Sequence, residues 1–177
     1  HGLASAPDTR SGEPPAQKKT WGCICDSYWL RHQRERRLRQ QPLFVVLPIK
    51  PPYAENARKL TELTRAGAHV VERALHESRI VHFAWFSIVE GGTHLAMSTA
   101  FDGDFDAYVE HFAVKVPLFD KQFELLDVDQ PTPIAKHPKE FVATIRRYNR
   151  APLAGYFYSA YPQRTVADIV HAFAGRP

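Results

Sequence analysis

The chain has 177 residues, of which 44% are hydrophobic and 12% aromatic. This composition can bury a sizeable core, and it excludes a wholly disordered protein. No run of about 18 apolar residues occurs, so we expect no membrane-spanning helix. The net charge of +4 is partly local, because five arginines lie between residues 31 and 39. Such a patch can attract nucleic acid, but a solvated helix face or a partner-docking arm is the commoner explanation, and we expect no nucleic-acid partner.

Two cysteines, Cys23 and Cys25, are separated by a single residue. This spacing is poor for a disulfide between them, and a zinc site would need two more ligands, of which His32 is one candidate. Reduced thiols in a cytosol-like compartment are the simpler interpretation. The start of the chain also lacks the charged, then apolar, then small-residue pattern of a secretory signal. We therefore predict a cytoplasmic protein without a metal site.

Two regions are expected. Residues 1–41 form an N-terminal arm: residues 1–19 are rich in Pro, Gly, Ser and charge, and a short basic helix is predicted over Asp26–Gln40. Residues 42–177 form the domain. Its first strand is predicted over Leu43–Ile49, where Pro48 indicates either a strand at the sheet edge or the end of the strand. A long amphipathic helix follows over Ala54–Ser78.

The centre of the domain is a predicted hairpin. Strands over Ile80–Val89 and Thr93–Phe101 flank Gly91-Gly92, a dipeptide that favours a two-residue turn. A helix is expected next, from Asp104 to about Leu126, with a kink or break at Pro117. It is followed by a helix over Pro138–Arg150 and a strand over Leu153–Tyr161. The last element is a helix over Thr165–Phe173, in which Thr165 is the N-cap and Asp168 completes a capping box.

This order of elements predicts an α+β fold, namely the ferredoxin-like split βαβ sandwich with an antiparallel four-stranded sheet. Helices cover one face of such a sheet and leave the other open. An open face that carries large apolar groups needs a cover. We therefore expect a homodimer or a partner protein on that face, with the N-terminal arm able to wrap across it.

Hairpin pairing divides the candidate ligand residues from the core. Pairing Val89 with His94 places a set of aromatic and small side chains together on one face of the hairpin. The other face, which includes His82, carries the bulkier side chains and is expected to lie under the helices. The mixed face leaves room for a hydrophobic small molecule, and it suits a dimer interface equally well. The candidate ligand-binding residues are Phe83, Trp85, Ser87, His94 and Ser98, together with Tyr156 and Tyr158 of the last predicted strand.

Two histidines are candidate catalytic residues. His82 is either a buried neutral imidazole with a hydrogen-bond partner, or a haem ligand or proton shuttle. His111 is either a solvated helix residue, or an axial ligand or general base. The acids Asp102, Asp104 and Asp106 are expected to cap a helix start rather than to bind metal. Phosphate-loop, nucleophile-elbow, H-E-x-x-H and CxxC motifs are absent from the sequence, which disfavours the hydrolases and nucleotide enzymes that carry them.

Three segments carry a family likeness: HFAWF at 82–86, AMSTAFDGDFDAYVEHFA at 96–113 and YFYSAYPQRTVADI at 156–169. They resemble a group of bacterial proteins with a ferredoxin-like domain. That group is similar to the dimeric α/β-barrel superfamily of antibiotic-biosynthesis-type monooxygenases, chlorite dismutases and dye-decolourising peroxidases. The resemblance implies oxidative chemistry on a small hydrophobic molecule, sometimes with haem. The Asp and Arg pattern that those peroxidases place beside the haem is not found.

The first functional hypothesis is a small oxidoreductase-like protein that binds a hydrophobic or aromatic molecule, with haem as the candidate cofactor and His82 or His111 as the reactive group. The alternative is a non-catalytic binding or assembly module that docks a partner through its open sheet face and its N-terminal arm.

Overall fold

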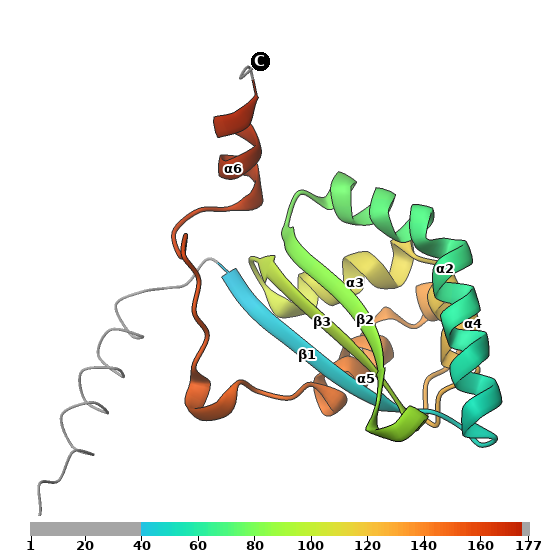
Figure 1. Cartoon of the computed structure of the whole chain (residues 1–177). Helices are drawn as coiled ribbons and strands as arrows, with labels where there is room; N and C mark the ends of the chain where they lie inside the picture. The colour runs from blue at the N-terminus through green and yellow to red at the C-terminus, as the bar shows by residue number, and fades with distance from the viewer. Residues whose placement is uncertain (1–39, 175–177) are drawn as a thin grey trace, which may run out of the picture. The chain divides into compact units, whose positions relative to one another are not determined.

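The computed structural model describes residues 40–174, which form an antiparallel three-stranded sheet with helices packed on one face (Figure 1). The strands are β1 (Gln40–Pro48), β2 (Val81–Val89) and β3 (His94–Asp102), in the spatial order β1-β3-β2. β3 is therefore central, and both of its neighbours pair with it antiparallel. The predicted basic helix lies outside the described residues, except for its last residue, Gln40, which begins β1. Both cysteines also lie outside them.

β1 confirms the first predicted strand; it lies at the edge of the sheet and ends at Pro48, so both interpretations of Pro48 hold. It begins at Gln40, three residues before the predicted start, and it contains Pro42 and Pro48. Proline has no backbone N–H to donate, so strands interrupted by proline are tolerated at sheet edges. The predicted helix that follows is also confirmed, as α2 (Tyr53–Ser78).

The β2–β3 hairpin has the predicted register but a longer turn. Its pairs run from Val89 opposite His94 to Phe83 opposite Ala100. The connection is a 3-10 turn over Glu90–Gly92 followed by Thr93, so the prediction of a two-residue turn was wrong. Glu90, Gly91 and Gly92 all have positive φ, at 54°, 62° and 95°. The left-handed stretch is one residue longer than the glycine pair suggested.

After the hairpin, the chain forms helices that cover the sheet. The long predicted helix is broken at Pro117 into α3 (Phe105–Lys115) and α4 (Leu118–Phe123), and α5 (Pro138–Tyr148) follows. Asp104 caps α3 by accepting hydrogen bonds from the backbone N–H groups of Asp106 and Ala107, at 2.9 and 3.0 Å. In Figure 1, α3 and α5 lie behind the sheet.

The predicted fourth strand is absent from the described residues, which overturns the ferredoxin-like four-stranded sandwich. Leu153–Gly155 form a 3-10 turn, with positive φ at Ala154 (52°) and Gly155 (69°), directly after Pro152. Left-handed residues behind a proline turn the backbone away from β1, so residues 156–160 make no strand ladder with it. The last predicted helix is confirmed as α6 (Val166–Phe173), with its Thr165–Asp168 capping box.

The core lies between the sheet and its helices. Alternate residues of β1 point into it, and Leu43, Val45 and Leu47 are at most 2% exposed. The ring of Phe101 in β3 is fully buried and stacks on Tyr108 of α3, with ring centroids 4.0 Å apart. The sheet is thus apolar on this side and tightly covered.

Candidate functional site

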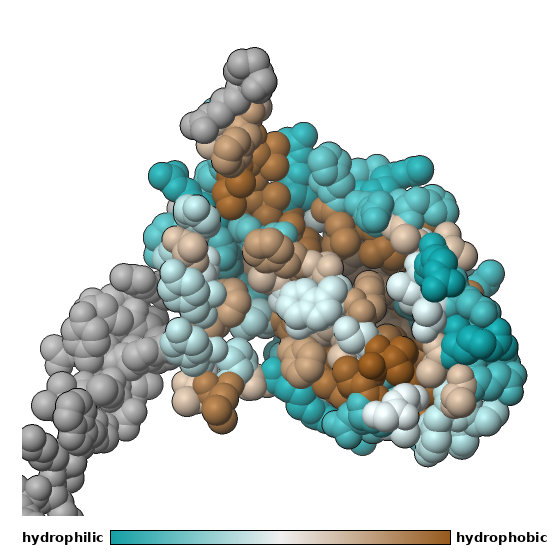
Figure 2. Space-filling view, viewed as in Figure 1, coloured by the Kyte–Doolittle hydropathy of each residue, from teal (hydrophilic) through white to brown (hydrophobic). Residues whose placement is uncertain are grey.

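The other face of the sheet is open and carries large apolar side chains. Phe83, Trp85 and Phe44 are 70%, 57% and 41% exposed. In Figure 2, which views this face, apolar residues gather over the strands, while hydrophilic residues cover α2. We call this surface the open sheet face; it comprises Phe44 and Val46 of β1, Phe83, Trp85 and Ser87 of β2, and His94, Ala96, Ser98 and Ala100 of β3.

Five of the predicted ligand residues lie together on the open sheet face, as the register prediction required. Trp85 is paired with Ser98 across the hairpin, and Phe83 and Ser87 follow on the same side of β2. His94 is half-buried and is the first residue of β3, and its Nδ1 lies 2.8 Å from the Thr93 hydroxyl. Their role as ligand-binding residues stays a prediction.

The other two predicted ligand residues, Tyr156 and Tyr158, lie in the irregular segment after α5. They are 60% and 72% exposed. Since this segment forms no strand, the expected alternation that would aim both rings at one sheet face does not apply. They belong to an exposed aromatic segment outside the sheet.

His82 occupies a β-bulge. Val81 is paired with Phe101 while Phe83 is paired with Ala100, so His82 is the extra residue between two pairs. Its Nε2 lies 2.9 Å from Oδ1 of Asp102, and the two side chains are only 7% and 8% exposed. An ionised carboxylate only accepts hydrogen bonds, so Nε2 carries the proton of this bond and a neutral ring has its lone pair on Nδ1.

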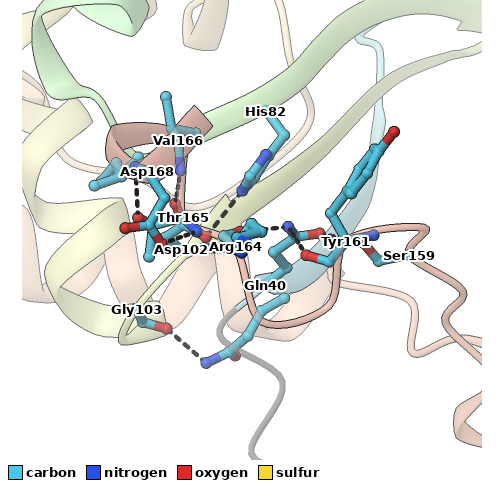
Figure 3. Close-up of polar contacts among 12 residues, drawn as sticks. Gln40, His82, Asp102, Gly103, Ser159, Tyr161, Arg164, Thr165, Val166 and Asp168 are labelled. Atoms are coloured by element: carbon cyan, nitrogen blue, oxygen red, sulfur yellow. Dashed lines mark hydrogen bonds and ion pairs between the residues drawn. The ribbon is translucent and has the colours of Figure 1, made fainter. Parts of the chain in front are cut away.

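Asp102 also ties the C-terminal helix to the sheet (Figure 3). Its Oδ2 accepts a 2.7 Å hydrogen bond from the backbone N–H of Val166, the first residue of α6. Nearby, Gln40 Nε2 donates to the carbonyl oxygens of Tyr161 and Arg164, at 2.9 and 2.7 Å. We call these contacts of Asp102 and Gln40 the C-terminal latch.

Asp102 is a residue of the candidate site that was not predicted from the sequence. It was expected to cap the helix now identified as α3, a role that Asp104 performs alone. The strand register could have indicated that Asp102 lies near His82. Asp102 follows Phe101, and Phe101 is paired with Val81, the residue before His82. The bulge that turns the imidazole toward the carboxylate has no comparable signature.

A groove of about 320 Å³ opens beside His82, between the C-terminal half of α2, the start of β2 and α6. Its apolar walls include Leu75, Val81 and Val170. Its polar groups are His82 and, from α2, Glu72, His76 and Arg79. The volume is at the lower end of the range of small-molecule sites. We call it the α6 groove.

The second candidate histidine, His111, lies apart from this groove. It is a half-buried residue of α3 whose ring meets Phe112 edge-on, with ring centroids 5.1 Å apart. His111 lines neither the α6 groove nor the core cavity. The structure therefore does not bring the two predicted catalytic histidines to one site.

The core contains a small apolar cavity beneath the sheet, lined by Tyr108 and Thr99 among others. The Tyr108 hydroxyl donates a 3.1 Å hydrogen bond to the Thr99 hydroxyl, and burial raises the pKa of Tyr108 to about 12. With about 30 Å³ of space, the cavity has the size for one or two water molecules and not for a substrate.

His82 is a poor fit for a haem ligand in its observed position, while haem binding by the chain stays a prediction. His82 is nearly buried and already bonds Asp102 through Nε2, and the groove beside it is small for a porphyrin. Among residues 40–174, no group of three or more His, Cys, Asp or Glu is placed to hold a metal ion. In the same part of the chain, no helix has the length and apolar character needed to cross a membrane.

Comparison with known proteins finds no matching family model, no similar curated protein and no similar solved structure. The likeness to dimeric α/β-barrel proteins therefore stays a prediction, and the candidate sites are argued from their own geometry.

Proposed function

We propose that residues 40–174 form a self-associating binding domain, in which the open sheet face of one copy packs on the same face of a second copy. The observation that carries this proposal is the exposure of Phe83, Trp85 and Phe44 on one continuous sheet surface. Exposed apolar patches of this kind mark interaction sites in proteins that are otherwise well packed.

A second copy suits this face because of its charge. Its nine residues include no Asp, Glu, Lys or Arg. In a two-fold dimer each residue meets the same patch on the partner, so a charge there would face its own copy. An uncharged aromatic face avoids that repulsion, and aromatic residues are typical of interface centres.

The area of the sheet sets a requirement on the dimer. Three strands of nine residues cover roughly 30 Å by 14 Å, or about 400 Å². Stable interfaces bury about 800 Å² per partner. The additional area has to come from beyond the sheet, and Tyr156, Tyr158 and Tyr161, all at least 60% exposed in the neighbouring segment, are suited to supply it.

The test is the mass of the full chain in solution, compared between two matched variants. Trp85→Glu places a carboxylate in the centre of the proposed interface, where burying an unpaired charge weakens association by about 30-fold or more. Val114→Glu is the control, since Val114 is an equally exposed apolar residue (55%) on α3. We expect light scattering to give dimers for the wild type and Val114→Glu, and monomers for Trp85→Glu.

A wild-type monomer at every accessible concentration would overturn the proposal, as would a Trp85→Glu dimer. The oxidoreductase activity and haem binding predicted from the sequence are separate from it. An absorption spectrum of the purified protein, before and after haem is added, tests them: a saturable Soret band supports haem binding, and a featureless spectrum contradicts it.

A further inference from the structure

We propose that the α6 groove binds a small monocarboxylate with an apolar tail, and that His82 takes up a proton when the ligand binds. This site adjoins the open sheet face at Phe83, which lines both surfaces, and the proposal does not require self-association. The site combines an apolar wall, a buried imidazole and an arginine at the rim in one groove.

His82 offers the groove a basic ring nitrogen that the fold does not use. Nε2 of His82 is engaged with Asp102, and Nδ1 has no hydrogen-bond partner among the described residues. Nδ1 is not among the fully buried polar atoms that lack a partner, so solvent reaches it. Because His82 lines the groove, Nδ1 is the ring nitrogen available to a polar ligand there.

Asp102 prepares His82 for an anion. When Nδ1 gains a proton, the imidazolium holds the Asp102 carboxylate through Nε2–H and presents Nδ1–H to the groove. The step is a simple proton uptake: an N–H bond forms at Nδ1, the proton comes from solvent, and the ligand remains an anion. A carboxylate accepts this hydrogen bond and neutralises the added charge.

The permanent charges on the rim of the groove balance, so protonation of its histidines is what favours an anion over a cation. Arg79 ends α2 and contributes a permanent positive charge, and His76 one turn earlier contributes a titratable one. Glu72 is the single carboxylate among the lining residues of α2. The charged groups nearest in the other elements, Asp102 of β3 and Asp168 of α6, are engaged in the latch and the capping box.

The apolar walls define the rest of the ligand. Leu75, Val81 and Val170 line the groove from α2, β2 and α6, so the tail of the ligand is held between three elements. Roughly 300 Å³ is enough for one or two rings or a short chain. We therefore use cinnamate as the probe and cinnamamide, its neutral isostere, as the matched control ligand.

Calorimetric titrations of the full chain at about pH 5.5 and about pH 8 bracket the ordinary titration of histidine, while the cinnamate carboxyl stays ionised at both. We expect cinnamate to bind about tenfold more tightly at the lower pH, and cinnamamide to bind weakly and equally at both. His82→Gln should remove the pH effect. A glutamine amide can still donate to Asp102, so the latch is retained.

Three further variants locate the site. Val170→Trp fills the groove without altering the His82–Asp102 pair and should abolish binding of both probes. His76→Gln should keep most of the pH effect, because the group responsible is His82. Trp85→Glu, at a residue of the open sheet face that does not line the groove, should leave binding unchanged.

The proposal is overturned if wild-type protein fails to bind cinnamate at millimolar concentration, or if cinnamamide binds as well as cinnamate. It is also overturned if folded His82→Gln keeps the pH effect, or if Trp85→Glu alone abolishes binding, since the probe would then lie on the open sheet face. Circular dichroism confirms that each variant is folded.

Discussion

The two faces of the sheet are built from the same strands and are both apolar, yet only one is covered. Leu43 and Val45 of β1 are at most 1% exposed beneath the helices, while Phe44 between them is 41% exposed on the other side. Successive side chains of a strand point to opposite faces of the sheet, so neighbouring residues of β1 lie in two different environments. The comparison indicates that the helix-covered face supplies the stability of the domain, and that the open sheet face is available for a partner.

The largest expected effect separates the two faces by stability. Phe101→Ala should lower the free energy of unfolding by about 3–5 kcal/mol, because it removes a fully buried ring stacked on Tyr108. Phe83→Ala, at a 70% exposed position on the open sheet face, should change it by less than about 1 kcal/mol in the monomer. Urea denaturation in dilute solution measures both. Equal losses would contradict the division between the faces.

A smaller effect concerns the two aspartates at the end of β3. Asp102→Ala should cost about 2–4 kcal/mol, because His82 and the Val166 N–H both lose a buried partner. Asp104→Ala removes an exposed N-cap and should cost about 1 kcal/mol. Hydrogen exchange of α6 amides should accelerate for Asp102→Ala and stay unchanged for Asp104→Ala. Faster exchange of α6 in Asp104→Ala but not in Asp102→Ala would show that Asp102 does not hold α6 to the sheet.

The smallest effect appears only in alkaline solution. The pKa of Tyr108 is raised to about 12 from the model-compound value of 10, so its contribution to stability is complete below pH 10. It is lost as the pH rises from 10 through 12, because the unfolded chain ionises first. Over this range, the stability of the wild type should fall more steeply than that of Tyr108→Phe, by about 2–3 kcal/mol in total. Parallel curves in alkaline urea titrations would show that Tyr108 is not buried as described.

Much of the fold could be predicted because its signals are local. Helical periodicity located α2 and α5, Pro117 located the break between α3 and α4, and the capping box located the start of α6. The hairpin register was also predicted. A shift of one residue would have exchanged the side chains of the two faces, so the pattern of bulky and small residues favoured one register.

The errors arose where the backbone departs from a regular pattern. The aromatic alternation after Leu153 is typical of a strand, but the left-handed conformation of Ala154 behind Pro152 is a tertiary outcome with no clear sequence signal. The bulge at His82 likewise changed its environment from the apolar core to the Asp102 carboxylate. The pairing of His82 with Asp102, and the groove that α6 makes beside it, depend on contacts between segments far apart in sequence.

The most direct test of the account is the solvent accessibility of Trp85 at low and high protein concentration. The chain has three tryptophans, and replacing Trp21 and Trp29 by phenylalanine leaves Trp85 as the single reporter. The account predicts that acrylamide quenches Trp85 strongly in dilute solution and several-fold less as the mass doubles, because a second copy covers the open sheet face. Strong quenching at every concentration would contradict it, and so would weak quenching in a monomer, which would mean that this chain covers its own open sheet face.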